Sequence, residues 1–331
     1  MHNIVEIKGL VKKFGEKAAV NGVDFGIREG EIFGILGPNG AGKTTTINMI
    51  LGILKPTSGT IKVSGLDVSR HEEEIKNMIG FMTQETLIEA DLTAVQNLEL
   101  FCELYHVDKE EVSERVASAL KEAGLENVAD QKAGTFSGGM QRRLALVRSM
   151  MHNPMILILD EPTTGLDIQN RLEMWKRIRK LQEKGVTIIL TTQYLEEADN
   201  LCNRIAIIDQ GEIKAQGTPS ELKSMIGKGS MLEILSDMRD AQKIADMLKS
   251  KFRISATVIG DKVSAPIIDR GIKVFNEIVN EISKAGYNVF SIGMHLPTLD
   301  DVFIKLTGSS LRDSVGENTS GNARVRMMAR R

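Results

Sequence analysis

Residues 32–54 read IFGILGPNGAGKTTTINMILGIL, and this stretch decides the fold. Its first five residues, 32–36, are apolar and have the length of a buried strand. They lead into GPNGAGKT at residues 37–44, which fits the pattern G-x-x-x-x-G-K-[ST] at every fixed position. Apolar residues then recur at helical spacing, at Ile47, Ile50, Leu51 and Leu54. The pattern predicts a strand, a glycine-rich loop and a helix in succession.

The glycine-rich loop is suited to the phosphates of a nucleotide. Glycines let backbone N–H groups converge on phosphate oxygens, and the helix N-terminus adds the positive end of its dipole. Lys43 would reach the β- and γ-phosphates, and the Thr44 hydroxyl would ligate Mg²⁺. The alternative is a glycine-rich turn with an incidental lysine, but the strand before and the helix after it argue against that. We expect this loop to bind nucleotide.

Length and composition indicate an ordinary globular chain. With 331 residues, two domains are expected. The apolar fraction of 42% is ordinary for a soluble globular protein. The net charge of −2 indicates no general attraction to nucleic acid or anionic lipid. No apolar run approaches a membrane span, and the first ten residues, MHNIVEIKGL, do not resemble a signal peptide. Cys102 and Cys202 are isolated, so neither a disulfide framework nor a zinc site is indicated. We expect a cytosolic chain.

A second apolar strand, Met155–Leu159, leads into Asp160-Glu161-Pro162. A carboxylate at the end of such a strand can hold a metal ion, so Asp160 is assigned to Mg²⁺, directly or through water. Glu161 follows it and could polarise the attacking water as general base. A strand-terminal acidic turn is the alternative for this motif alone. The phosphate-binding loop makes the metal and base assignments the better interpretation.

Ser137-Gly138-Gly139 forms a further motif. Structurally it predicts a left-handed turn that opens an amphipathic helix capped by serine. Functionally, a serine hydroxyl and two glycine amides at a helix N-terminus make a second anion site. Two phosphate-binding helix termini in one chain suggest that two chains pair head to tail across two nucleotides.

The order of these motifs, with Gly165-Leu166-Asp167 after them, is similar to the ABC ATPase family over about the first 220 residues. The resemblance implies an α/β P-loop NTPase core over residues 1–222, with an inserted helical subdomain at about 86–150 that docks on a transporter. It implies ATP and Mg²⁺ as cofactors. The implied nucleotide contacts are Phe14, Gly37, Pro38, Asn39, Gly40, Ala41, Gly42, Lys43, Thr44, Thr45, Ser137, Gly138, Gly139 and Asp167.

The resemblance also implies individual roles. Phe14 would stack on adenine, although a buried core phenylalanine is the alternative. Gln84 would touch Mg²⁺ and the attacking water and signal to the membrane subunit, and Ser137 would complete the site of the opposite subunit. The implied catalytic residues are Lys43, Gln84, Glu161 and Gln193, and the implied metal ligands are Thr44, Gln84 and Asp160.

Two positions depart from the general family pattern. Met140 follows Ser137-Gly138-Gly139, where glutamine is common, and Gln193 occupies the position of the switch histidine. A glutamine amide can donate a hydrogen bond to the γ-phosphate but cannot become cationic, so pH sensitivity and charge stabilisation should fall. Because Lys43, Thr44 and the carboxylates are present, we expect an altered but active site.

Both departures resemble the ATP-binding subunits of daunorubicin-resistance-type drug exporters, as does PTLDDVFIKLTG at residues 297–308. This branch implies a homodimer through the ATP sites, peripheral on the cytoplasmic face of the membrane. It also implies a separately encoded permease that exports hydrophobic compounds without cargo contact by this subunit. Export of lipid, polysaccharide or ions stays open. A soluble ABC ATPase acting on DNA or ribosomes would need a coiled-coil insertion or tandem nucleotide domains. Only one phosphate-binding loop and one SGG occur, and we expect no nucleic-acid partner.

Residues 223–308 predict a second, smaller α+β domain. Strand and helix patterns follow the order βαββαβ around a hairpin signal at Gly260-Asp261, which predicts a ferredoxin-like split βαβ module. Such a module could regulate, dimerise or brace. Residues 309–331 are polar, with five arginines against two acidic residues, and predict a disordered basic tail.

Overall fold

The computed structural model of this chain describes residues 3–85, 87–227, 229–267 and 271–307. The chain divides into two compact units, Met1–Gln216 and Gly217–Arg331. The break precedes the predicted boundary at residue 222 because α8 (Pro219–Ser224) packs against α11 (Leu299–Thr307) of the second unit. There, Lys305 Nζ donates to the Met225 carbonyl at 2.9 Å. The tail predicted at residues 309–331 lies outside the described residues.

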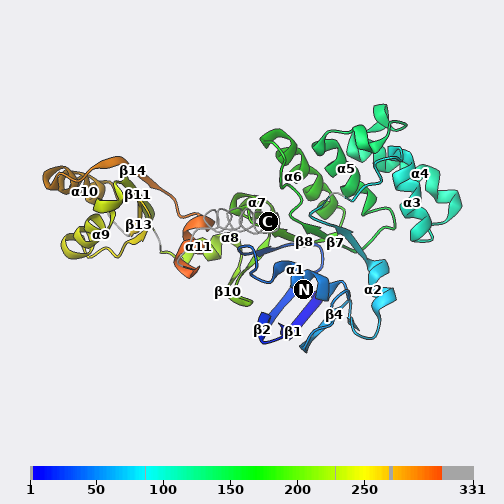
Figure 1. The fold of residues 1–331 in the computed structure, drawn as a ribbon, viewed down its shortest axis with the longest axis horizontal. Coiled ribbons are helices and arrows are strands. Elements are labelled where there is room, and N and C mark those ends of the chain that lie inside the picture. The colour runs from blue at the N-terminus through cyan, green and yellow to red at the C-terminus, as the bar shows by residue number, and fades with distance from the viewer. Residues whose placement is uncertain (1–2, 86, 228, 268–270, 308–331) are drawn as a thin grey trace, which may run out of the picture. The chain divides into compact units, whose positions relative to one another are not determined.

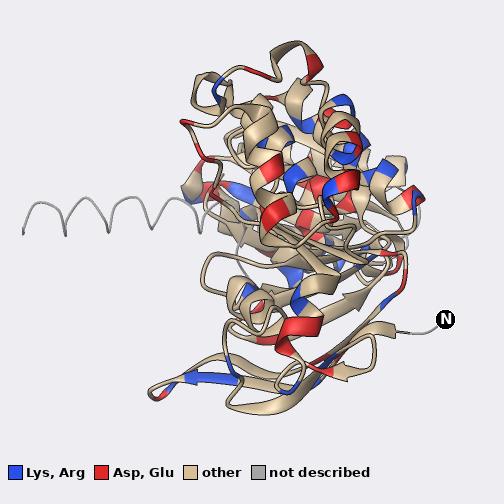
Figure 2. Ribbon diagram, turned by 90° about the vertical axis from the view of Figure 1, so that its right-hand side faces the viewer, with Lys and Arg blue, Asp and Glu red and all other residues tan. Residues whose placement is uncertain are grey.

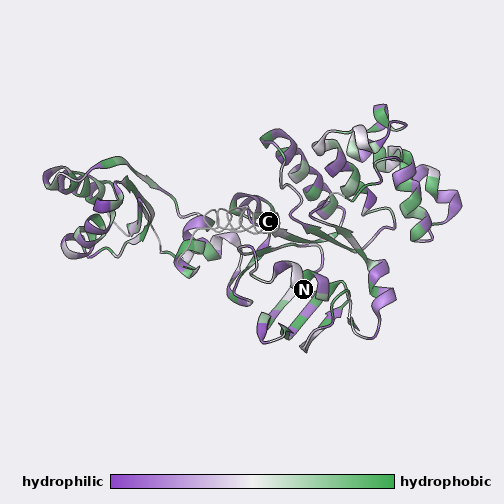
Figure 3. Ribbon diagram, in the orientation of Figure 1, coloured by the Kyte–Doolittle hydropathy of each residue, from purple (hydrophilic) through white to green (hydrophobic). Residues whose placement is uncertain are grey.

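A six-stranded sheet forms the centre of the first unit, in the order β10-β9-β3-β8-β7-β6 (Figure 1). Its strands are β3 (Ile32–Leu36), β6 (Ile79–Met82), β7 (Ile156–Asp160), β8 (Thr187–Thr192), β9 (Arg204–Asp209) and β10 (Glu212–Gly217). From β9 to β6 all neighbours are parallel. Strands β3, β7 and β8 are buried along their whole length, and they are largely hydrophobic in Figure 3. Their carboxyl ends therefore meet at one edge of the sheet.

An antiparallel sheet in the order β2-β1-β4-β5 packs beside the central sheet. Its strands are β1 (Asn3–Phe14), β2 (Lys17–Arg28), β4 (Ser58–Val63) and β5 (Leu66–Asp67). The Phe25 ring of β2 stacks on the Phe33 ring of β3 at 5.2 Å. Side chains of β1, β3 and α1 (Lys43–Ile50) share one hydrophobic cluster, so this sheet holds the helix that follows the glycine-rich loop.

Helices form a separate layer of the first unit. They are α3 (Ala94–Leu104), α4 (Lys109–Ala123) and α5 (Gly138–Arg148), with 3₁₀ turns at Glu126–Val128 and Ala133–Thr135. They enclose a hydrophobic cluster of their own, which includes Leu98, Leu120 and Leu144. Together these helices and turns lie within residues 94–148. Three other helices, α2 (Glu72–Met78), α6 (Ile168–Glu183) and α7 (Leu195–Leu201), follow β5, β7 and β8.

The second unit contains β11 (Ser230–Ser236), α9 (Met238–Phe252), β12 (Thr257–Ile259), β13 (Lys262–Ile267), α10 (Gly271–Ala285) and β14 (Val289–His295). The strands form an antiparallel sheet in the order β12-β13-β11-β14. Leu232, Ile234 and Val263 of this sheet share a core with Ile244 of α9 and Ile278 of α10. These six elements follow the order βαββαβ.

Charge and hydropathy add two observations. Lysine and arginine are interspersed with aspartate and glutamate in Figure 2, in keeping with a net charge near zero. Within the described parts of the chain, none of the helices combines the length and the apolar composition that a bilayer crossing requires.

Candidate nucleotide-binding and hydrolysis site

Two glycines of the loop between β3 and α1, Gly37 and Gly42, have no space for a side chain. Gly42 has φ +106°, and a Cβ there would lie 2.4 Å from the Ala19 carbonyl oxygen of β2. A Cβ on Gly37 would lie 2.2 Å from the Ile208 carbonyl oxygen of β9. The loop backbone is thus pressed between two strands. It is held in a conformation that only glycine adopts without strain.

Lys43 and Thr44 begin α1 at the mouth of this loop. Lys43 is buried, and its ammonium donates to the carbonyls of Gly37 at 2.7 Å and Pro38 at 3.1 Å. Burial lowers the pKa of Lys43, while the nearby Glu161 and Asp160 carboxylates act to raise it. No side chain caps α1, so its first N–H groups can bind an anion, and the Thr44 side chain is exposed. These features fit a nucleotide phosphate with an accompanying Mg²⁺.

Asp160 and Glu161 stand where β7 ends. Asp160 is buried, and Thr191 Oγ1 of β8 donates to its carboxylate. Glu161 has φ +48°, a left-handed conformation that is strained for a residue with a side chain. Its backbone N–H donates to the Thr191 carbonyl at 3.0 Å, which holds this turn in place.

Three side chains converge on one oxygen of Glu161. Its Oε2 accepts hydrogen bonds from Gln84 Nε2 at 3.1 Å, Thr164 Oγ1 at 3.1 Å and Gln193 Nε2 at 3.4 Å. Gln84 follows β6, Thr164 follows β7 and Gln193 follows β8, so the carboxyl edge of the parallel sheet brings them together. Two of the expected catalytic residues, Gln84 and Gln193, thus lie within hydrogen-bonding distance of a third, Glu161.

The serine–glycine motif forms the N-terminus of α5. Ser137 caps the helix by accepting from the Met140 N–H at 3.3 Å, as expected. The predicted left-handed turn is wrong, because Gly138 and Gly139 already belong to the helix and neither has a positive φ. Within the described residues, no hydrogen bond joins this motif to the loop at 37–45. The motif is therefore not part of its own chain's phosphate loop in this structure.

The start of α6 lies beside this motif. A Cβ on Gly139 would lie 2.6 Å from Asn170 Oδ1, so glycine permits the close packing of α5 on α6. Asp167 is the N-cap of α6, where its Oδ1 accepts from the Asn170 N–H at 2.8 Å. Hydrogen bonds from Asn170 lower the pKa of the exposed Asp167 carboxyl. Asp167 and the serine–glycine motif therefore share one surface.

Phe14 ends β1 and is 54% exposed, so it is not the core residue that the alternative required. The Lys12 ammonium lies 5.3 Å from the centre of its ring. Its hairpin partner strand β2 supplies Ala19, which contacts the phosphate loop at Gly42. An exposed ring on a hairpin that borders the loop is available for stacking.

Arg142 of α5 is a site residue that the sequence did not reveal. It is buried, and its guanidinium donates to the carbonyls of Thr83, at 3.2 Å, and Gln84. Burial lowers the pKa of Arg142, and the Glu161 carboxylate acts to raise it. Arg142 thus fixes the backbone that carries Gln84. The sequence signal for this residue was the pair of adjacent arginines, Arg142 and Arg143, on one helix.

Glu197 of α7 is a second such residue. It is fully buried, and its Oε1 accepts from Thr163 Oγ1 at 2.8 Å and Trp175 Nε1 at 2.9 Å. Burial raises the pKa of its carboxyl, against the hydrogen bonds that it accepts. Glu197 therefore ties the segment after Glu161 to the helix after Gln193. Its position between Leu195 and Ala198 placed it near the apolar face of α7.

Comparison with known proteins agrees with this geometry. The family model described as ABC transporter matches residues 20–164. The daunorubicin resistance ATP-binding protein DrrA2 of Streptomyces coeruleorubidus is 40% identical over 309 residues, which cover 92% of this chain and 95% of that protein. The Nod factor export ATP-binding protein I of Burkholderia orbicola is 38% identical over 93% of this chain and 98% of its own.

A solved structure shows the same fold. A dimeric ATP-binding cassette, in a post-hydrolysis state with ADP and Pi, is 32% identical, with a TM-score of 0.59. The match covers 65% of this chain and 98% of that one. The predicted P-loop NTPase core is confirmed, and the chain is an ATPase that couples ATP hydrolysis to transport. The chain therefore belongs to the ABC transporter family, among the ATP-binding subunits of the daunorubicin-resistance branch.

Proposed function

We propose that two copies of this chain bind two MgATP between them and drive a separately encoded membrane permease. The permease would export drugs or other hydrophobic compounds. The observation that carries the catalytic part is the convergence of Gln84, Thr164 and Gln193 on Glu161 Oε2. Three donors on one oxygen orient the carboxylate and leave its other oxygen to accept a proton from water.

Each residue of the site has a separate task in this proposal. The Lys43 ammonium and the N-terminal amides of α1 hold the β- and γ-phosphates, in place of the loop carbonyls that Lys43 now contacts. Mg²⁺ held by Thr44, Asp160 and Gln84 would neutralise charge on those phosphates. Glu161 takes the proton from the attacking water. Gln193, which bonds Glu161 here, would donate to the γ-phosphate as a neutral group.

The partner in the ATP site would be a second copy of the chain. Among the described residues, no hydrogen bond joins Ser137 at the start of α5 to its own phosphate loop, and Asp167 lies on the same surface. Two large apolar side chains next to Asp167 are exposed, Ile168 at 72% and Leu172 at 46%. Burial of these side chains against the second copy would stabilise the dimer. The ATP-bound cassette would close when Ser137 meets the phosphates of the opposite site.

A groove of the first unit suits the permease. A cavity of about 570 Å³ is lined by Leu51, Ile53, Glu73, Lys76, Asn77, Ile79, Phe81, Leu104, Tyr105 and His106. Ile53 and Leu104 are exposed at 64% and 61%, as expected of a surface that another protein covers. Phe81 lies on β6, which continues into Gln84. A permease helix in this groove would lie next to the segment that senses the nucleotide, and would place the chain on the cytoplasmic face of the membrane.

The names of the relatives support export but differ in cargo. One relative is named for daunorubicin resistance and the other for Nod factor export, at nearly equal identity to this chain. Similar ATP-binding subunits thus serve different cargoes, which supports a subunit that does not touch the cargo. Drug export is proposed because relatives named for daunorubicin resistance and for linearmycin resistance match almost the whole chain.

The test is the ATPase rate of the purified chain, alone and with its candidate permease in lipid, with and without daunorubicin. We expect the permease and the drug together to stimulate hydrolysis. Leu104→Asp should abolish the stimulation without changing the basal rate, because Leu104 lines the groove and lies outside the nucleotide site. Hydrolysis indifferent to both permease and drug would refute drug export. A stimulation unaffected by Leu104→Asp would refute the groove.

A further inference from the structure

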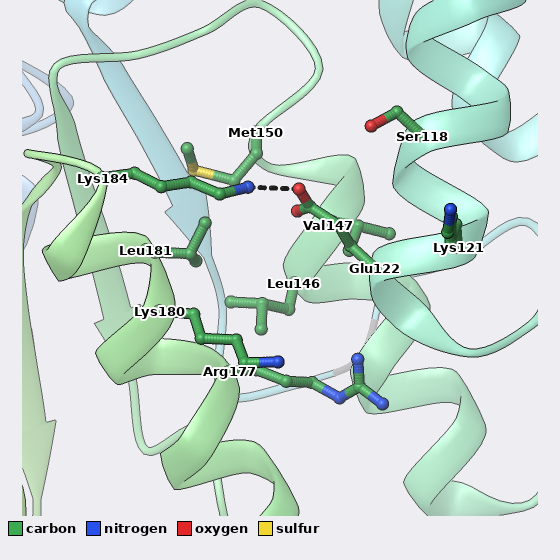
Figure 4. A pocket seen from close by; sticks show the side chains of 10 residues that line it. All are labelled: Ser118, Lys121, Glu122, Leu146, Val147, Met150, Arg177, Lys180, Leu181 and Lys184. Atoms are coloured by element: carbon green, nitrogen blue, oxygen red, sulfur yellow. Dashed lines mark hydrogen bonds and ion pairs between the residues drawn. The ribbon is translucent and has the colours of Figure 1, made fainter.

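A second cavity lies between the C-terminal halves of α4, α5 and α6, with a volume of about 610 Å³. Figure 4 shows its walls: α4 on one side, α6 on the other and α5 between them. Its apolar lining consists of Leu146, Val147, Met150 and Leu181. This volume falls in the range of about 300–1,000 Å³ that small-molecule sites occupy. The nucleotide site does not use any of these residues.

The polar lining of this cavity is strongly cationic. Lys121, Arg177, Lys180 and Lys184 face a single carboxylate, Glu122, a formal net charge of +3. Glu122 already pairs with Lys184 across the cavity, as Figure 4 shows. Among the residues that the structure describes, no carboxylate lies within ion-pair distance of Lys121, Arg177 or Lys180. Arg177 and Lys180 extend from α6 towards α4 in Figure 4. The cavity therefore joins an apolar floor to three cations that form no close ion pair with a described carboxylate.

Arg177 is the best-placed of these cations. Its Nε is buried and has no hydrogen-bond partner in the described part of the chain. A second guanidinium lies beside it: a Cβ on Gly124 would be 3.4 Å from Arg143 Nη1 and 3.5 Å from Arg177 Nη2. Arg143 Nη1 already donates to the Ala123 carbonyl at the end of α4. Burial first, and then the charge of Arg143, lower the pKa of Arg177, while the carboxylates of Glu173, Glu122 and Glu126 act to raise it. Two adjacent guanidinium groups repel each other, and a bound anion would relieve that repulsion.

We propose that this cavity binds a small organic anion with an apolar body, such as an alkyl phosphate. Arg177 and Lys180 would hold its charged head, and Leu146, Met150 and Leu181 would cover its apolar part. The site is remote from the nucleotide. Asp167 caps α6 some fourteen residues before Leu181, which places the cavity roughly 20 Å from that end of the helix. The ligand would touch α4 of the helical layer and α6, which follows the central strand β7.

The test is calorimetric titration of the full chain with three probes. The probes are decyl phosphate below its micelle concentration, inorganic phosphate, and the neutral decyl maltoside. We expect one saturable decyl phosphate site per chain, with affinity at least about tenfold above that of either other probe, because only decyl phosphate meets both halves of the cavity. Equal affinity for decyl maltoside would overturn the proposal, since the cations would then contribute nothing. Equal affinity for inorganic phosphate would overturn it too, since the apolar floor would then be unused.

Variants locate the site. Arg177→Gln combined with Lys180→Gln should weaken decyl phosphate binding at least about tenfold, since two charge-assisted contacts are lost. Lys176→Gln is the matched control, an exposed lysine on the same helix that does not line the cavity, and should bind like the wild type. Wild-type affinity in the double variant would overturn the proposal. If the double variant does not fold, Ser118→Glu replaces it as the test. This variant adds a carboxylate to the cavity lining from an exposed position on α4, and should weaken decyl phosphate binding. Unchanged binding by Ser118→Glu would overturn the proposal.

Discussion

Glu197 gives the sharpest prediction, because its buried carboxyl accepts hydrogen bonds from two buried donors. Glu197→Ala would leave Thr163 Oγ1 and Trp175 Nε1 without the oxygen that they contact at 2.8 and 2.9 Å. Each unpaired buried donor costs about 1–3 kcal/mol. The cavity left by the lost side-chain atoms adds to that cost. We therefore expect Glu197→Ala to lower the free energy of unfolding by about 3–6 kcal/mol.

Glu197→Gln should have the opposite effect at neutral pH. Glutamine keeps a carbonyl oxygen for both donors. Burial raises the pKa of Glu197 above its usual 4.5, so the folded wild type keeps a proton that the unfolded chain releases as pH rises. Wild-type stability therefore falls by up to about 1.4 kcal/mol per pH unit between pH 4.5 and the raised folded pKa. The variant has no such proton. Its stability relative to wild type should therefore grow as pH rises above 4.5.

The assay is urea unfolding of the full chain from about pH 5 to about pH 8. The only tryptophan of the chain, Trp175, reports on the contact itself. Glu196→Gln is the control: its carboxylate is exposed on the same helix, and it should show no such pH-dependent difference. If Glu197→Gln is destabilised at neutral pH, or if its advantage does not grow with pH, the carboxyl is charged in the folded protein. The argument from burial would then be refuted.

Three further predictions concern turnover. Glu161→Gln should lower the rate of ATP hydrolysis by about 10²–10⁴-fold and leave ATP binding intact. The ATP-bound variant should accumulate as a dimer in size-exclusion chromatography. Near-wild-type hydrolysis would show that another group is the base. Gln193→His should keep or raise the rate of ATP hydrolysis and make that rate depend on pH around about 6.5, as ATPase assays across pH would show. A large loss of ATPase activity would mean that the site is built around an amide. Arg142→Lys removes the guanidinium that donates to the carbonyls of both Thr83 and Gln84. The rate of ATP hydrolysis should therefore fall about tenfold, with little change in melting temperature. An unchanged rate would contradict this role of Arg142.

The elements around the phosphate loop were predictable because their causes are local. The strand expected at 32–36 has those bounds, since five apolar residues before a glycine-rich loop leave few alternatives. β7 is shifted by one residue and includes Asp160, because the pairing of Asp160 with Thr191 of β8 extends the strand. That pairing depends on a residue some thirty positions away, which no local pattern reveals.

The supporting residues of the site were not predictable for the same reason. Arg142 acts through backbone carbonyls of the loop that follows β6, and Glu197 acts through Thr163 and Trp175. In sequence, each is a charged residue on a helix, for which solvent exposure is the ordinary expectation. Their burial follows only from the tertiary packing of α5 and α7. The same holds for Arg177, whose neighbour Arg143 is remote in sequence.

Helix α5 joins the parts of the site that have to respond together. It begins at Ser137, where the phosphates of an opposite subunit would bind, and Gly139 packs against Asn170 at the start of α6. About one turn later, Arg142 holds the backbone of Thr83 and Gln84, and Gln84 in turn donates to Glu161. A displacement of Ser137 by a nucleotide would therefore reach Gln84 through a single rigid helix. The serine–glycine motif of one subunit would thus act on its own catalytic carboxylate as well as on its partner's nucleotide. Hydrolysis at one ATP site should therefore depend on the nucleotide bound at the other.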